Sequence, residues 1–67
     1  MDMRKKVGAN VRNFREKADF SQEELADRSG LHRTYISGVE RGVRNPTVLV
    51  LAKIAKALGV DASLLLK

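Results

Sequence analysis

Apolar residues recur along this chain at the three- and four-residue spacing of amphipathic helices. The first stripe steps by four, four, three and four residues through Met3, Val7, Val11, Phe14 and Ala18. Side chains at this spacing share one face of a helix, so we expect a first helix over residues 2–18. Phe20 lies in the connection that follows and is expected to enter the core.

Three shorter apolar patterns come next. They predict helices over residues 22–28, 32–40 and 48–58, with a last turn or short fifth helix from Asp61 or Ala62 to Leu66. The side chains expected to meet in the core from these helices are Leu25, Ala26, Leu31, Ile36, Val39, Leu51, Ile54, Ala55 and Leu58. The fold class is therefore all-α, a compact bundle of four to five short helices.

Local signals mark where these helices begin and end. Ser21 followed three residues later by Glu24 is a capping-box pair, in which the hydroxyl accepts a backbone N–H and the carboxylate reaches back. Thr47 can cap the fourth helix. Gly30 and Gly59 predict helix ends, because glycine accepts the positive φ with which a helix commonly ends.

Two short helices separated by a glycine turn form a helix-turn-helix pattern over about residues 21–41. In the DNA-binding form of this motif the second helix lies in the major groove, with its N-terminal residues against base edges. Here those residues are His32, Arg33, Thr34 and Tyr35, and each of them can form hydrogen bonds. The pattern indicates a helix that reads DNA.

Charge and composition narrow the classes of protein that fit. The 67 residues include 13 Lys and Arg against 8 Asp and Glu, a net charge of +5, which favours a polyanionic partner. With no Cys, a single His and no paired-carboxylate cleft, we expect no metal, no cofactor and no enzyme activity. No apolar run approaches the roughly 20 residues that span a bilayer, and no signal-peptide region follows Met1. We therefore expect one cytoplasmic domain over residues 1–67, without a membrane partner or small-molecule ligand.

Several spaced motifs resemble the Cro/CI-type (XRE) helix-turn-helix regulators. The motifs are V-G-x-x-V-R-x-F-R at 7–15, S-Q-E-E-L-A at 21–26, T-Y-I-S-G-V-E-R-G at 34–42, R-N-P-T at 44–47 and A-L-G-V at 57–60. This resemblance covers nearly the whole chain and implies the lambda repressor-like fold. Within the family, residues 32–47 look most like the controller proteins of restriction–modification systems, although R-T-Y-I-S also occurs in other members.

The resemblance implies roles in DNA contact for individual residues. Arg33 and Thr34 match base-contacting positions, and an arginine fork suits O6 and N7 of guanine. Gln22 matches a position that clamps a phosphate at a helix start. The expected base contacts are Arg33, Thr34 and Tyr35, and the expected backbone contacts are Gln22, His32, Ser37, Arg41 and Arg44. Structural alternatives stay open: a polar first-turn Gln22, a capping His32, a partly buried Tyr35 and solvated arginines.

Three further positions have expected roles of another kind. In the family, the residues matching Arg15 and Glu40 form a partly buried ion pair that ties the first helix to the end of the third. Gly38 stands where many members carry a longer base-reading side chain. Its lack of a side chain either narrows the readout or lets the helix approach the DNA more closely.

Apolar residues left over after the core is filled suggest a two-fold interface. Leu49 and Val50 fall off the inner stripe of the fourth helix, and Leu64, Leu65 and Leu66 exceed what a last turn needs. Such leucines can also fold back on their own chain. We expect Leu49, Val50 and Leu64 to form a dimer surface in the same domain, because two reading helices about 34 Å apart match successive major grooves.

These observations together predict a homodimeric transcription regulator that binds a palindromic operator on double-stranded DNA. The controller-protein resemblance implies autoregulation, with RNA polymerase as a further protein partner. A prophage repressor and an antitoxin of the same fold remain alternatives, which neighbouring genes would discriminate. A helical protein-interaction module is the alternative from another class, and its affinity for duplex DNA would stay feeble at low salt.

Overall fold

Four α-helices and a final 3-10 turn make up the computed structural model, which describes residues 2–67. The elements are α1 (Met3–Lys17), α2 (Gln22–Ser29), α3 (Arg33–Glu40), α4 (Val48–Leu58) and η1 (Ala62–Leu65). The all-α fold class expected from the sequence is confirmed. Each predicted helix differs from the observed one by no more than one residue at either end.

Side-chain oxygens cap the starts of α1, α2 and α4. They belong to Asp2, Ser21 and Thr47 and accept backbone N–H groups at 2.9, 3.0 and 3.2 Å. The expected capping box at α2 is only half formed, because the Glu24 carboxylate accepts from Nε of Arg28 at 2.7 Å instead of reaching back. The reciprocal bond predicted for Glu24 was therefore wrong.

Left-handed residues end all four α-helices, and after α3 this residue is Gly42, with φ 77°. Gly30 and Gly59 have φ values of 73° and 72°, as the sequence predicts for α2 and α4. The end of α1 was not anticipated: Asp19 has φ 63° and donates its N–H to the Glu16 carbonyl at 3.0 Å. The N–H of Phe20 then bonds the Arg15 carbonyl at 3.1 Å, which completes a Schellman motif around a residue that is not glycine.

The core draws on every element. Its buried apolar residues are Val7, Val11, Leu25, Ala26, Ile36, Val39, Leu51, Ile54, Ala55 and Leu65. Two predictions were wrong: Met3 is 49% exposed, and Phe20 stays outside this cluster with its ring 4.4 Å from the Arg28 guanidinium. Leu65 was expected among the surplus leucines but is fully buried, and Nδ2 of Asn10 donates to its carbonyl at 3.0 Å.

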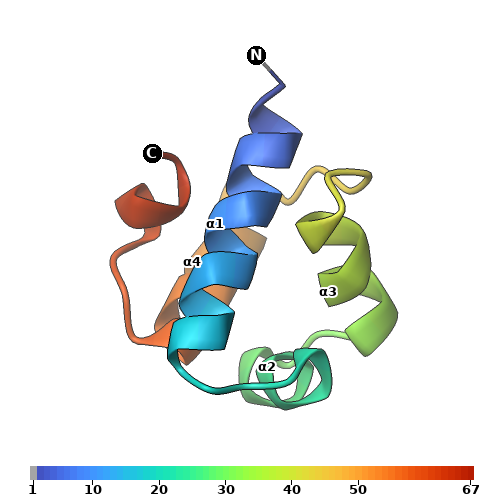
Figure 1. The fold of residues 1–67 in the computed structure, drawn as a ribbon, viewed down its shortest axis with the longest axis vertical. Coiled ribbons are helices and arrows are strands. Elements are labelled where there is room, and N and C mark those ends of the chain that lie inside the picture. Colours follow the sequence, from blue (N-terminus) through green and yellow to red (C-terminus); the bar gives the residue numbers. More distant parts are fainter. Residues whose placement is uncertain (1) are drawn as a thin grey trace.

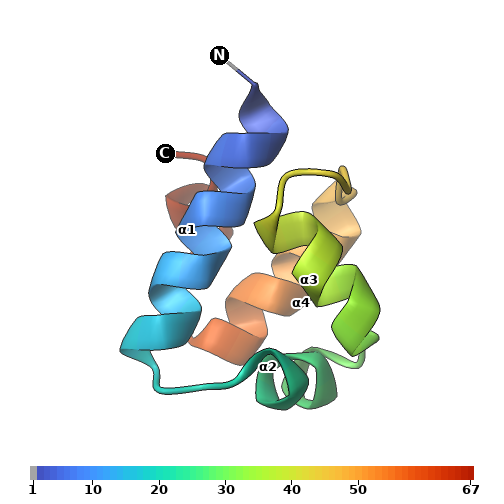
Figure 2. The same cartoon turned by 45° about the vertical axis from the view of Figure 1, so that its right-hand side comes forward.

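The arrangement leaves one helix at the side of the molecule. In Figure 1, α1 (blue) passes in front of α4 (orange), with η1 on one side of this pair and α3 on the other. α2 crosses the lower end, and the turned view of Figure 2 places α3 in front of α4. In both views no other described helix covers the outer side of α3.

A close contact between backbones joins α3 to α1. Gly8 is buried, and a Cβ there would collide with the carbonyl oxygen of Val39 and lie 2.8 Å from that of Glu40. The missing side chain therefore lets the two helices approach each other closely. Over residues 2–67, no helix is both long enough and apolar enough to cross a membrane.

Candidate nucleic-acid interface

The helix-turn-helix pattern of the sequence is present as α2, a turn through Gly30, and α3. Ile36 and Val39 are fully buried and hold α3 against the core. Arg33 and Thr34, at the first turn of α3, are exposed. The N-terminal turn of α3 is therefore both anchored and accessible, which a reading helix requires.

Four of the expected DNA-contacting residues line one shallow hollow. Its volume is about 210 Å³, and it is lined by Gln22, Arg33, Thr34 and Ser37. A neighbouring hollow of about 520 Å³ shares Gln22 and Arg33 with it and adds Arg15, Ser21 and Glu23. The start of α2 and the outer face of α3 thus form one continuous surface, where amide, hydroxyl and guanidinium groups can meet a phosphate or a base edge.

A hydrogen-bonded network underlies this surface. Nε of Arg15 bonds one carboxylate oxygen of Glu40 at 2.6 Å, and a second guanidinium nitrogen bonds the other oxygen at 3.1 Å. The Arg15 guanidinium also donates to the Phe20 carbonyl at 2.7 Å, which links the pair to the loop before α2. The side chains are 13% and 4% exposed. The hydrogen bond to Glu40 raises the pKa of Arg15 above its ordinary value, which by itself already keeps a guanidinium charged at physiological pH.

The same carboxylate orients Gln22. Its Nε2 donates to Oε1 of Glu40 at 3.1 Å, across 18 positions of sequence. One amide hydrogen is used in this bond, which leaves the second hydrogen and the amide oxygen for other partners. Sequence reasoning assigned Glu40 to the ion pair alone and missed this second role. No local sequence signal predicts this hydrogen bond, because Gln22 and Glu40 meet only when α2 packs beside the end of α3.

The other predicted contacts lie outside the hollow. Tyr35 is half-buried against the core, so less of its ring is accessible to DNA than in a fully exposed base-contacting residue. His32 is the N-cap residue of α3 and is exposed, but its side chain makes no capping bond. The structure therefore does not support a capping His32. Arg41 and Arg44 are exposed beyond the other end of α3.

The expected dimer residues differ in exposure. Leu49 is 75% exposed, and its neighbour Val48 is 84% exposed. Val50 and Leu64 are half-buried, and Val50 packs partly against the core. The expectation that the core has no place for Val50 was therefore wrong.

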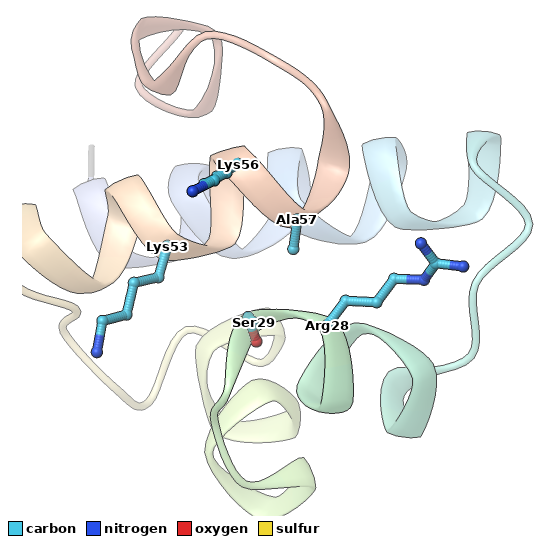
Figure 3. Close-up of a pocket in the computed structure, with 5 residues that line it drawn as sticks. All are labelled: Arg28, Ser29, Lys53, Lys56 and Ala57. Carbon is cyan, nitrogen blue, oxygen red and sulfur yellow. The ribbon is translucent and has the colours of Figure 1, made fainter.

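A third hollow, between α2 and α4, is a weaker candidate. It has a volume of about 390 Å³ and is lined by Arg28, Ser29, Lys53, Lys56 and Ala57. Figure 3 shows that the charged ends of Arg28 and Lys53 point away from each other rather than into a common site. Arg28 is also already paired with Glu24. Nor do residues 2–67 bring together three or more His, Cys, Asp or Glu side chains that could hold a metal ion.

Comparison with known proteins agrees with this geometry. The helix-turn-helix family HTH_3 matches residues 11–65. The chain is similar to the control protein C.SmaI of Serratia marcescens, with 48% identity over 66 residues that cover 98% of this chain and 79% of that protein.

Two solved structures are also similar to it. The restriction-modification controller protein C.AhdI of Aeromonas hydrophila has a TM-score of 0.90 and 42% identity, covering 92% of this chain and 94% of that one. The controller protein C.Esp1396I was solved as a tetramer in complex with its natural 35 base-pair operator. Its TM-score is 0.88 and its identity 38%, covering 97% of this chain and 86% of that one. The present chain therefore belongs to the HTH_3 helix-turn-helix family, of the Cro/CI (XRE) type that its motifs resemble.

Proposed function

We propose that this protein is a transcription regulator that binds a palindromic operator on double-stranded DNA as a homodimer. The observation that carries the proposal is the surface formed by the start of α2 and the first turns of α3. Gln22 is held there on Glu40, beside exposed Arg33 and Thr34. The similarity to C.Esp1396I, solved on its operator, supports the same use of this surface.

Each contact has a distinct chemical role. Arg33 offers a fork that can bond O6 and N7 of guanine, and Thr34 offers a methyl group and a hydroxyl to neighbouring bases. Gln22 stands at the start of α2, where unpaired N–H groups and the helix dipole favour an anion, so its free amide hydrogen serves a phosphate. Ser37, His32, Arg41 and Arg44 add backbone contacts. Tyr35, which is partly buried against the core, contacts the wall of the groove with its exposed part.

Dimerisation supplies what one domain lacks. A single α3 offers few base contacts, whereas two copies related by a two-fold axis double them and read a palindrome. Exposed Leu49, with the half-buried Val50 and Leu64, provides the apolar seam within this same domain. The similarity to restriction–modification controller proteins favours an autoregulatory role in such a system, acting in the cytoplasm and with RNA polymerase as a partner at the promoter.

Selection of duplexes from a random library tests the proposal. The expected result is a two-fold symmetric sequence preference, with half-site centres about 10 base pairs apart and affinity that falls steeply with salt through counterion release. Weak, sequence-independent binding even at low salt would contradict it and would favour the protein-interaction module. Neighbouring endonuclease, lysis or toxin genes separate a controller from a prophage repressor or an antitoxin.

A further inference from the structure

Gly38 lies on α3 at a point where another residue of the same chain fills the space of its missing side chain. A Cβ built on Gly38 would lie 2.6 Å from Cγ of Arg44 and 3.6 Å from Nε of the same residue. By contrast, a Cβ at Gly30 or Gly59 meets nothing within 4 Å. Gly38 is buried, and the stem of the Arg44 side chain is what covers it.

The backbone fixes the same contact a second time. The Gly38 carbonyl accepts the N–H of Val43 at 3.0 Å and the N–H of Arg44 at 3.2 Å. Arg44 is thus held to α3 through its main chain and through the stem of its side chain. Its guanidinium forms no ion pair or hydrogen bond with any side chain or backbone group of residues 2–67, and Arg44 as a whole is exposed.

We propose that Gly38 is a positioning residue for Arg44. Because Gly38 has no side chain, the Arg44 stem can pack on α3 and direct its guanidinium to a DNA phosphate. This inference rests on the proposed function. An arginine on a free loop loses much rotamer freedom when it binds, whereas a stem already packed on a helix has lost part of that freedom beforehand. Gly38 accordingly contributes to DNA binding through Arg44, without a contact of its own.

A double-mutant cycle on operator binding tests this role. Arg44→Ala is expected to weaken binding about tenfold, which is in the range for the loss of one hydrogen bond between charged groups. It should also flatten the log–log salt slope by about 1 for each phosphate that Arg44 no longer neutralises. Gly38→Ala should weaken binding in the same way, because its Cβ displaces the Arg44 stem. In the double variant, Gly38→Ala should add less than about twofold to the effect of Arg44→Ala, which is the error of additivity.

The cycle separates this mechanism from a closer approach of α3 to the DNA, which is one of the explanations that the sequence left open for Gly38, and from base reading by Arg44. If Gly38 is small so that α3 can approach the DNA closely, Gly38→Ala will weaken binding equally with and without Arg44, and the positioning role is overturned. If Arg44 reads a base edge instead of a phosphate, Arg44→Ala will change sequence preference and leave the salt slope unaltered. That result would overturn the phosphate assignment. Lys56→Ala is the charge-matched control, because it removes one positive charge at the far end of α4.

A measurement without DNA tests the contact between Gly38 and Arg44 separately from the proposed function. In the free protein, nuclear Overhauser effects are expected between the Gly38 α-protons and the Arg44 γ-protons. Thermal melts should show that Gly38→Ala raises the melting temperature more in the Arg44→Ala background than in the wild type. Alanine has the higher helix propensity, and in that background the nearest atom that its Cβ meets is Val43 Cγ2 at 3.6 Å, an ordinary van der Waals contact. Missing Overhauser effects and equal melting shifts would show that the Arg44 side chain does not pack on Gly38, which would overturn the positioning role. If the packing of Arg44 on Gly38 is confirmed but the wild type binds no duplex, the proposed function is wrong instead.

Discussion

Arg15 on α1 and Glu40 at the end of α3 form a two-bond ion pair across 25 positions of sequence, with a shortest distance of 2.6 Å. Both side chains are largely withdrawn from water, and Gln22 shares the same carboxylate. The pair therefore ties α1 to the helix-turn-helix, which we propose binds DNA. Loss of either partner leaves a largely desolvated charge without its ionic partner.

Glu40→Ala should destabilise the protein by about 3–5 kcal/mol, since it leaves the Arg15 guanidinium unpaired and removes the acceptor of Gln22. Urea denaturation followed by circular dichroism measures the free energy of unfolding. The double variant Arg15→Met with Glu40→Leu should recover most of this loss, because a well-packed apolar pair removes the unpaired charge. A loss below about 1 kcal/mol for Glu40→Ala would mean that the pair behaves as an exposed one.

Gly8→Ala should destabilise the protein by about 2 kcal/mol, because its Cβ would collide with backbone carbonyls of α3 that cannot rotate away. The gain in helix propensity, about 1 kcal/mol, offsets only part of this cost. Ala9→Gly, on the exposed side of the same helix, calibrates the propensity difference. An increase in the denaturation midpoint for Gly8→Ala would contradict the close approach of α1 and α3.

Asp19→Gly should stabilise the protein by about 0.5–1 kcal/mol, because glycine adopts φ near 63° without the steric cost that an L-residue bears there. For a domain of this size, the change corresponds to a rise of a few degrees in melting temperature. Asp19→Asn is the control that removes the charge and keeps a similar side chain. If asparagine stabilises as much as glycine, charge rather than backbone conformation is responsible.

Arg33→Ala should weaken operator binding and relax the preference at one base pair of each half-site, by about 1–3 kcal/mol for each bidentate pair with guanine that is removed. Binding-site selection with the variant and the wild type side by side measures both effects. Lys56→Ala, on α4, should leave the selected sequence unchanged. Identical sequence preferences for Arg33→Ala and the wild type would remove Arg33 from the base-reading residues.

Leu49→Arg should shift the proposed dimer to monomer, since it would place a charge from each subunit in the proposed apolar seam. At 75% exposure, Leu49 can be replaced with little effect on the monomer fold, whereas the half-buried Leu64 cannot be changed so cleanly. Sedimentation equilibrium reports the mass, and circular dichroism reports the helix content. Ala9→Arg adds the same charge on α1 and should leave the dimer intact. A Leu49→Arg protein that remains dimeric would move the interface elsewhere.

The sequence by itself determined where the helices lie, because the signals for helix starts and ends act over a few residues. Ser21 and Thr47 cap an N–H three positions on, and Gly30 and Gly59 allow the left-handed turn at their own position. These interactions are almost the same in any tertiary context, so the boundaries followed from the pattern. The motif spacing likewise indicated the family and the reading helix.

The tertiary structure decided which of several equivalent local choices each side chain makes. Glu24 could reach back to Ser21 or forward to Arg28, and it bonds Arg28. Phe20 and Leu65 are both apolar and near a helix end, yet only Leu65 enters the core. The contacts of Glu40 with Gln22 and of Gly38 with Arg44 could not be predicted from the sequence either. Gln22 meets Glu40, and Arg44 covers Gly38, only after the chain has folded. Local energies of such alternatives are nearly equal, so packing between elements distant in sequence selects among them.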